Sequence, residues 1–364
     1  MVGVQTNDQR LSDAKEYLQS LSNLERSPVT GVHNVTDTKH YDLVAVVITM
    51  NRDRTLTDED RRRTFNLGYL TQTVARLLQI LHVDATAEFQ RKKLIVCNVD
   101  TQPQTFTEAL HLSNHVQIVS RYQNNSMEFH NGIKGDMFEK EKDDYVYCLQ
   151  AASRFASPYY LIVEDDVMLD ESAIETVSFI MNYFNLFSTT DWLFLKLYYP
   201  DKWLGYSQSR ETVFEIGGYS VLGGSFFAVV IQLTSRHRKW LPNCRNLPVW
   251  FWFVVGAVFT ALLCASIGRQ YVELWRQYIV STHRLVAAPG CCTQAIVYPA
   301  HVLPDLSVHL NHVHCDYDFS VDVAIDGFAN IRGLKRHLIQ PNVGKHIGLI
   351  SNLRRNSKSA QHFL

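Results

Sequence analysis

Apolar runs and helical patterns alternate along the first part of the chain. Residues 42–50 (DLVAVVITM) and 94–99 (LIVCNV) are almost wholly apolar, which is typical of strands buried on both faces of a sheet. Between them, an acidic helix start at 57–60 precedes apolar residues that recur three and four positions apart from Leu67 to Leu81. This strand, helix, strand order predicts a βαβ unit with a right-handed crossover. The pattern therefore favours a Rossmann-like α/β domain with a parallel sheet.

The same reasoning predicts further elements on both sides of this unit. A polar segment at 5–26 has apolar residues at helical spacing and predicts a stalk or packing helix. Further strands are predicted at 116–120, 159–164, 192–199 and 295–299, with a helix at 138–153 and a closing segment at 337–350.

Two uncharged segments interrupt the α/β pattern. Residues 216–234 and 247–268 contain no charged side chain, and each is about the 20 residues that a helix needs to cross a bilayer. A pair of buried core helices would look similar, but the aromatic cluster at 250–253 is typical of a membrane interface. The connecting stretch has no acidic residue and four basic ones: Arg236, Arg238, Lys239 and Arg245. By the positive-inside rule, this loop is predicted to face the cytosol and both flanking parts the lumen.

Three acidic residues follow directly on the apolar run at 159–163. Glu164, Asp165 and Asp166 are predicted at the carboxyl end of a buried strand, where open α/β sheets bind ligands. Adjacent carboxylates repel one another, and a divalent cation with a bound diphosphate is the simplest neutraliser, because hard cations choose oxygen ligands. The pattern indicates a transferase that uses a nucleotide sugar. An ordinary turn with a solvated acidic cluster explains the same residues.

Composition narrows the classes of function. The 364 residues are 20% charged and 46% hydrophobic with a formal net charge of −1, which fits a globular enzyme with a small membrane element. Without a basic field, nucleic acid is not expected as a partner. No G-x-G-x-x-G follows the first strand and there is no P-loop, so a dinucleotide cofactor has no support.

The cysteines and sequons bear on the compartment. None of the seven cysteines has the C-x-x-C spacing of a structural zinc site. In the secretory lumen five of them could form two disulfides with one left over, in a connectivity that the sequence leaves open: Cys97, Cys148, Cys291, Cys292 and Cys315. Sequons at Asn34 and Asn124 agree with a lumenal glycoprotein. Residues 1–40 contain no signal anchor, so we expect an upstream membrane segment; a reversed orientation is the alternative.

Five strings resemble the family of Golgi transferases that add N-acetylgalactosamine to the glycan of GPI anchors. They are FEKEKDDYVYCL (138–149), VEDD (163–166), LKLYYP (195–200), CCTQAIVYPA (291–300) and PNVGKHIGLISNLR (341–354). The resemblance spans about residues 10–355 and implies a GT-A-like glycosyltransferase domain interrupted by a transmembrane hairpin. The expected parts are a stalk (1–40), a first catalytic part (41–213), the hairpin (214–270) and a second catalytic part (271–364). The last string is also similar to the N-acetylglucosaminyltransferases that branch N-glycans, which lack the split.

The resemblance also implies roles for individual residues. Asp166 is expected to bind the metal, with Glu164 on the metal or the ribose, and Asp165 is expected on the donor side. His346 would complete the metal site, although a surface or capping histidine explains its position too. Thr49, Asn51 and Arg52 follow the first strand, where uracil and ribose usually bind, or they form a plain turn.

The implied reaction needs a base on the acceptor side. Asp322 is the candidate, with Asp326 one helical turn on as the reserve, and either one would equally serve as a helix cap or a solvated residue. The resemblance implies a Mn²⁺-dependent, inverting transfer from UDP-GalNAc to a mannose of GPI-anchored proteins. It places the enzyme in the Golgi membrane as a multi-pass protein in contact with lipid, with a lumenal catalytic domain. The rivals are a metal-dependent hydrolase and an inactive glycan-binding membrane protein.

Overall fold

The computed structural model describes residues 2–25, 40–52, 67–82, 89–122, 137–187, 189–200, 203, 205–206, 210–237, 247–279 and 282–348. The chain divides into two compact units. Met1–Tyr199 and His283–Leu364 form the first, and Pro200–Thr282 form the second. The expected helix start at 57–60, both sequons and most of the basic loop (238–246) lie outside the described residues.

The described part of the first unit is built on a mixed, mostly parallel sheet of eight strands in the order β3-β2-β1-β4-β8-β6-β9-β7. The strands are β1 (Leu43–Thr49), β2 (Lys92–Asn98), β3 (Gln117–Ser120), β4 (Tyr159–Glu164), β6 (Trp192–Lys196), β7 (Arg284–Ala287), β8 (Ala295–Pro299) and β9 (Lys335–Gln340). Strand β8 is antiparallel to β4 and β6, and β7 is antiparallel to β9. The βαβ pattern alone predicted a parallel sheet, and these antiparallel pairs of β8 and β7 correct that prediction.

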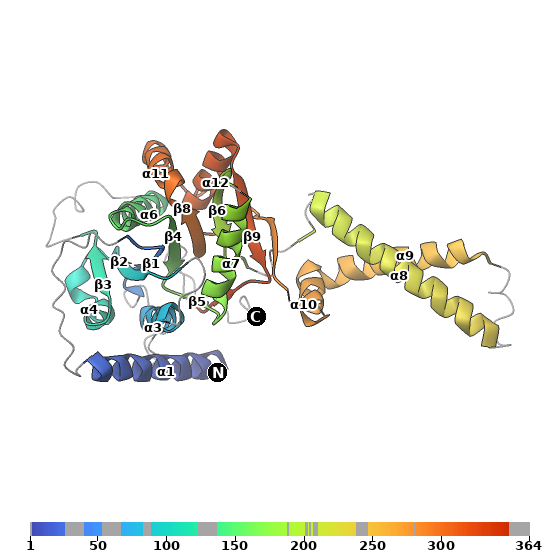
Figure 1. Cartoon of the computed structure of the whole chain (residues 1–364), viewed down its shortest axis with the longest axis horizontal. Coiled ribbons are helices and arrows are strands. Elements are labelled where there is room, and N and C mark those ends of the chain that lie inside the picture. Colours follow the sequence, from blue (N-terminus) through green and yellow to red (C-terminus); the bar gives the residue numbers. More distant parts are fainter. Residues whose placement is uncertain are drawn as a thin grey trace. The chain divides into compact units, whose positions relative to one another are not determined.

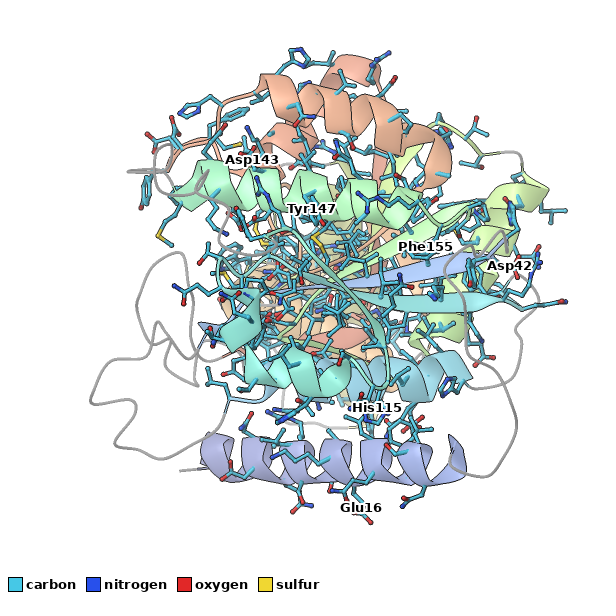
Figure 2. All side chains as sticks on the ribbon, turned by 90° about the vertical axis from the view of Figure 1, so that its left-hand side faces the viewer. Glu16, Asp42, His115, Asp143, Tyr147 and Phe155 are labelled. Atoms are coloured by element: carbon cyan, nitrogen blue, oxygen red, sulfur yellow. A yellow bond between two sulfur atoms is a disulfide. The ribbon has the colours of Figure 1, made fainter. Side chains whose placement is uncertain are left out.

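Helices cover both faces of this sheet (Figures 1 and 2). On one face α3 (Tyr69–His82), α4 (Thr107–Leu112) and α7 (Ala173–Leu186) share one apolar core with alternate residues of the strands. On the other lie α6 (Met137–Ser153), α11 (Leu303–His312) and α12 (Val321–Arg332). Both faces of β1 and β4 are thus covered, which explains why these strands read as continuous apolar runs.

Helix α1 (Val2–Glu25) forms an outer layer on α3, with Glu16 on its outer side (Figure 2). Its apolar residues Leu11, Ala14 and Leu18 are buried, and Arg10 donates a hydrogen bond of 2.9 Å to Gln72. The helical spacing of the segment at 5–26 is therefore that of a packing helix.

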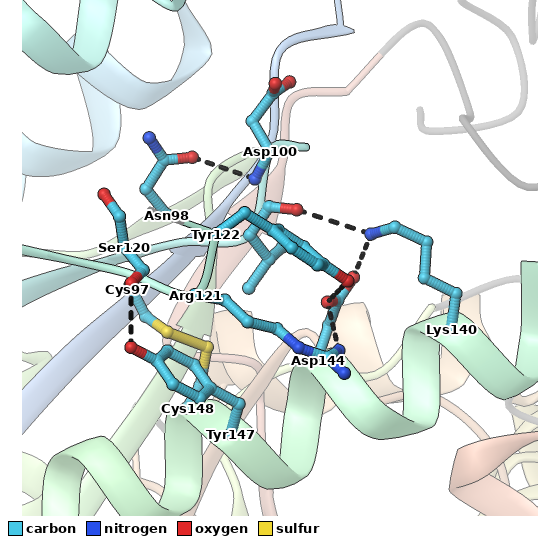
Figure 3. The surroundings of a disulfide bond; sticks show 11 residues. Cys97, Asn98, Asp100, Ser120, Arg121, Tyr122, Lys140, Asp144, Tyr147 and Cys148 are labelled. Carbon is cyan, nitrogen blue, oxygen red and sulfur yellow. Dashed lines mark hydrogen bonds and ion pairs between the residues drawn. A yellow bond between two sulfur atoms is a disulfide. The ribbon is translucent and has the colours of Figure 1, made fainter. Parts of the chain in front are cut away.

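A disulfide between Cys97 and Cys148 joins β2 to α6 (Figure 3). Beside it, the carboxylate of Asp144 pairs with both Arg121 and Lys140, and Tyr147 donates a hydrogen bond of 2.9 Å to the carbonyl of Ser120. The second disulfide joins the neighbours Cys291 and Cys292, and both cysteines have positive φ angles of 91° and 77°. Cys315 stays free and buried, so the expectation of two disulfides with one cysteine left over is met.

The second unit contains the two uncharged segments as α8 (Arg210–His237) and α9 (Val249–Ile267), followed by α10 (Arg269–Ile279). The stretches Thr212–Thr234 and Val249–Ile267 are long and apolar enough to cross a membrane, and only 11% of each is buried. Within the described part of this unit, neither stretch is buried as a core helix would be.

Glycines explain how α8 and α9 pack. A Cβ on Gly223 would lie 1.9 Å from the Thr260 hydroxyl, and one on Gly256 would lie 2.5 Å from Cβ of Phe227. The two backbones approach each other closely at these positions, which is typical of helix pairs in membranes. Two of the glycines that make the first segment look weakly apolar, Gly223 and Gly224, are thus part of the helix interface.

Candidate active site

The acidic triplet lies at the carboxyl end of β4, next to the carboxyl end of β1. The parallel register pairs Ile48 with Glu164, and the backbone N–H of Asp165 donates to the carbonyl of Ile48 at 3.1 Å. Thr49, the last residue of β1, donates from its hydroxyl to Oδ2 of Asp165 at 2.7 Å. The structure therefore brings together two groups of residues that are far apart in sequence and were both predicted to hold the donor.

Arg52 is the counter-ion of the triplet. Its guanidinium pairs with Asp165 and lies 2.7 Å from Oδ2 of Asp166, and its cation lies 5.7 Å from the centre of the Tyr69 ring. Burial alone would raise the pKa of Asp166, but the charges of Arg52 and His346 hold it below its usual range. A cation of the chain itself thus neutralises carboxylates that the sequence pattern assigned to a metal.

His346 reaches the triplet through a small second sheet. Strand β5 (Val167–Leu169) pairs with β10 (Gly344–His346), and the antiparallel register sets His346 opposite Val167. Its Nε2 lies 3.2 Å from Oδ2 of Asp166, and the next backbone N–H, that of Ile347, donates to the carbonyl of Asp166 at 2.8 Å. The surface or capping alternative is excluded, because the side chain is buried against Asp166.

The backbone must come unusually close to this pair at Gly348. A Cβ at that position would lie 2.1 Å from Oδ2 of Asp166 and 2.7 Å from Cε1 of His346. Only a residue without a side chain fits beside the two groups as they stand.

Glu164 points to a different partner from its two neighbours. Its Oε1 accepts a hydrogen bond of 2.9 Å from the hydroxyl of Thr293, and its backbone N–H donates to the carbonyl of Gln294. Burial, and then the charge of Asp166, raises the pKa of Glu164 to about 7. At neutral pH this carboxyl is therefore shared between its acid and its carboxylate form.

The segment 288–294 connects Glu164 to the two candidate bases. The backbone N–H of Cys292 donates to Oδ2 of Asp322 at 2.8 Å, and a Cβ on Gly290 would lie 2.7 Å from Oδ2 of Asp326. Asp326 also pairs with Arg336 at 3.2 Å. The carboxylates of both predicted bases thus have protein partners, and neither forms a hydrogen bond with the triplet.

Lys196, the last residue of β6, binds the backbone of the segment 288–294. This buried side chain donates to the carbonyls of Pro289, at 3.2 Å, and Cys291. Burial lowers its pKa to about 8. Its hydrogen bonds are to the backbone, so it positions the segment that touches Glu164 and Asp322.

Sequence reasoning missed Glu141 on α6. Burial, followed by the charges of Glu164 and Asp322, raises the pKa of Glu141 to about 8. Tyr145, one turn further along the helix, meets Tyr298 of β8 at 2.9 Å between their hydroxyl oxygens. Helical spacing puts Glu141 on this same sheet-facing side. The string FEKEKDD gave no signal, because six charged residues in seven hide which one faces inward.

The residues expected to bind uracil and ribose lie beside the end of β2. The backbone N–H of Asn51 donates to Oδ2 of Asp100 at 2.9 Å, and the backbone N–H of Gln102 donates to Oδ1 of the same residue. Asn51 and Arg52 are thus held by neighbouring acids rather than lying in a plain turn.

The triplet can be tested for its fit to a divalent cation. Among the described residues, no group of three His, Cys, Asp or Glu side chains has the arrangement of a metal site. Oδ1 of Asp166 is nevertheless buried without a hydrogen bond, and the imidazole of His346 lies against the other oxygen. Two protein ligands suit a cation that takes its remaining ligands from a diphosphate and water. Asp166 and His346 fit such a cation.

A model of the family described as GPI-N-acetylgalactosamine transferase PGAP4 matches residues 43–345. The chain belongs to this family. The match starts with β1, includes α8, α9 and α10, and ends directly before His346. The resemblance of the five strings is confirmed, and the PGAP4 family makes the chain a glycosyltransferase. The expected α/β fold with a mostly parallel sheet and an inserted pair of apolar helices is confirmed as well.

Two solved structures are similar to part of this PGAP4 family member. They are crystal structures of residues 1–349 of S. aureus TarS, one of them in complex with UDP-GlcNAc. Each has 12% sequence identity and a TM-score of 0.25, over 43% of this chain. The chain covers 34% and 33% of the two TarS chains, so it spans about a third of their length.

Proposed function

We propose that this glycosyltransferase moves N-acetylgalactosamine from UDP-GalNAc to a mannose of a GPI-anchor glycan, with inversion at the anomeric carbon. Membership of a family described by this activity supports the donor and the acceptor. The observation on which the proposal depends most is the pair of Asp166 and His346 beside the carboxyl ends of β1 and β4. Such a position is where α/β sheets bind nucleotides.

The chain's own residues prepare this edge of the sheet for a nucleotide diphosphate. Arg52 is fixed by Asp165 and Asp166 and offsets the negative charge near the phosphates. Thr49 and Asn51 fix the turn that carries Arg52, through their hydrogen bonds to Asp165 and Asp100. Glu164 instead contacts Thr293, in the segment 288–294 that is assigned to the acceptor. When bound, a divalent cation such as Mn²⁺ on Asp166 and His346 would neutralise the departing UDP.

The acceptor side is assigned to the residues around the segment 288–294. Asp322 is the proposed base for the acceptor hydroxyl, because the neighbouring residues Cys292 and Thr293 contact Asp322 and Glu164. Both acids therefore lie along one segment, and a single displacement needs the base opposite the leaving group. Asp326 is the reserve, although its ion pair with Arg336 makes its carboxylate less available.

The helices α8 and α9 are proposed to hold the enzyme in the Golgi membrane with the sheet unit on the lumenal side. A lipid-anchored acceptor then meets the site at a raised effective concentration. Replacing residues 210–279 by a soluble linker should lower activity on GPI-anchored proteins more than on a free glycan. An equal loss on both acceptors would contradict this role.

A donor screen tests the proposed reaction. The purified full chain is given UDP-GalNAc, UDP-GlcNAc or UDP-galactose with a GPI-anchored acceptor, and UDP release and the mass of the acceptor are followed with and without Mn²⁺. We expect UDP-GalNAc to be preferred, and Asp166→Asn and His346→Ala to lose about 10²-fold or more in rate. Asp191→Asn, which removes an exposed partner of Lys335, serves as the matched control.

The rival assignments give different results in the same assay. A preference for UDP-GlcNAc with an N-glycan acceptor would indicate a branching N-acetylglucosaminyltransferase. UDP binding without turnover on any acceptor would indicate a glycan-binding protein that has lost activity.

A further inference from the structure

Helix α10 has an inverted distribution of apolar and charged residues. Tyr271, Leu274, Trp275 and Tyr278 have the spacing i, i+3, i+4 and i+7, which puts them on one face of the helix. These side chains are 51%, 52%, 75% and 95% exposed, and Ile279 is also exposed. Five large apolar or aromatic residues on an eleven-residue helix are thus turned outward.

The charged residues of α10 are turned inward and paired. Glu273 is 4% exposed and accepts a hydrogen bond from Arg276 at 2.6 Å. Arg269 pairs with Glu215 of α8 at 3.0 Å, and both side chains are nearly buried. In water the opposite arrangement is favoured, with charges solvated and apolar groups buried. The surroundings of this face are therefore not expected to be water.

The outward face of α10 continues the outer surface of α9. Gly268, with φ of 93°, lets the chain turn directly after α9, and α10 leaves the line of that helix (Figure 1). Leu262 and Ile267, in the last turns of α9, are 63% and 46% exposed. Large exposed apolar residues therefore occur on both sides of the turn at Gly268, on the proposed membrane span and on the next helix.

The length and residue types of α10 fit the surface of a bilayer rather than its core. Eleven residues span about 16 Å, which is too short to cross the apolar core. Trp and Tyr are the residues that collect at the level of the lipid headgroups, where one end of the ring stays wet. The described residues of the exposed face include no lysine or arginine, so anionic lipid is not required.

We propose that the exposed face of α10 lies in the interface of the bilayer that α8 and α9 cross, in contact with lipid headgroups and the first acyl carbons. This inference rests on the proposed membrane insertion of that helix pair. In this arrangement α10 fixes the depth at which the chain leaves the membrane, a few residues before β7 begins at Arg284.

Depth-dependent quenching in the full chain tests the proposal. Tyr278→Cys is labelled with an environment-sensitive dye and reconstituted in neutral phosphatidylcholine vesicles that carry a nitroxide near the headgroup or deep in the acyl chain. An interfacial helix lies ~5–10 Å into the boundary, so the shallow nitroxide should quench about twofold more than the deep one. Leu262→Cys in α9 should show the opposite order, and the same dye on free cysteine in the buffer gives the water reference. The native Cys264 and Cys315 are buried, and the labelled native chain gives the background.

Each other result overturns the inference in a distinguishable way. Loss of deep quenching at Leu262 would remove the membrane hairpin on which it rests. Normal quenching at Leu262 with Tyr278 behaving like the water reference would place α10 in water. A blue-shifted dye at Tyr278 that neither nitroxide quenches would mean that a protein surface covers this face instead of lipid. Equal results in neutral vesicles and in vesicles with anionic lipid support the proposal, whereas a requirement for anionic lipid contradicts it.

Discussion

The imidazole of His346 lies 3.2 Å from the carboxylate of Asp166, although the whole second unit intervenes between them in sequence. The three-residue pairing of β5 with β10 sets this distance, because it places His346 opposite the residue that follows Asp166. The proposed metal ligands thus belong to the two different halves of the split sheet unit.

Gly348→Ala is expected to abolish most activity while the fold persists. Its Cβ would meet Oδ2 of Asp166 at 2.1 Å and push apart the proposed metal ligands. A displacement of about 1 Å in a catalytic group costs on the order of 10²-fold in rate. Rates of UDP release and circular dichroism are measured together. Gly327→Ala in α12, where a Cβ meets nothing within 4 Å, is the matched control and should keep full activity.

Arg52→Met should destabilise the protein by roughly 3–5 kcal/mol, because it leaves Asp165 and Asp166 buried without their counter-ion. If the triplet also binds a divalent cation, Mn²⁺ should raise the melting temperature of this variant more than that of the native chain. Thermal unfolding with and without Mn²⁺ measures both effects. An Arg52→Met variant as stable as the native chain, or insensitive to Mn²⁺, would argue against this view of the site.

Glu141→Gln should stabilise the protein at neutral and alkaline pH. The pKa of this carboxyl is about 8 in the folded chain against 4.5 for an ordinary glutamic acid, so the folded state favours the neutral acid. Its contribution is fully present below pH 4.5 and is lost as the pH rises through about 8. Gln stays neutral, and its advantage should grow by about 1.4 kcal/mol for each pH unit between these two values and then level off. Unfolding is followed from pH 5 to 9; a stability difference that does not change with pH would refute the prediction.

Removing the Cys97–Cys148 disulfide should lower the melting temperature by about 5–10 °C, which corresponds to a loss of ~2–4 kcal/mol for a cross-link of this span. The double Ala variant is compared with Cys315→Ala, which removes a buried thiol without a cross-link. Reductant should lower the melting temperature of the native chain and of Cys315→Ala by a similar amount, and that of the double Ala variant much less.

Gly256→Val should separate α8 from α9, since its Cβ would lie 2.5 Å from Cβ of Phe227. Cysteine cross-linking between the two helices should fall, with little change at Gly217→Val, where a Cβ meets nothing. Efficient cross-linking in Gly256→Val would show that the helices can repack.

The elements that follow a clear period could be predicted from the sequence, and those that depend on pairing could not. The apolar runs of β1, β2 and β4 and the leucine spacing of α3 gave correct strands and a correct helix, because burial on both faces or on one side leaves a pattern in the sequence. The antiparallel direction of β8 leaves none, since a five-residue apolar strand reads the same both ways.

The candidate site shows the same limit. Glu164, Asp165 and Asp166 were visible because three acids follow a strand without a break, and His346 because of the matched string. Arg52 as their counter-ion was not foreseeable from a polar turn whose spatial neighbours lie more than a hundred positions away. Helix α10 was missed because its charged residues interrupt the apolar pattern in the sequence. Only the burial of the charged side chains shows that the apolar ones face outward.

The place of β8 between β4 and β6 has a consequence for biogenesis. Both neighbours are translated before the inserted helices, and β8 is translated after them. During synthesis the nascent sheet therefore consists of β3, β2, β1 and β4, and β6 has no neighbour until β8 and β9 have been made. A chain that stops before β8 leaves one edge of β4 and both edges of β6 unpaired, and such edges favour aggregation.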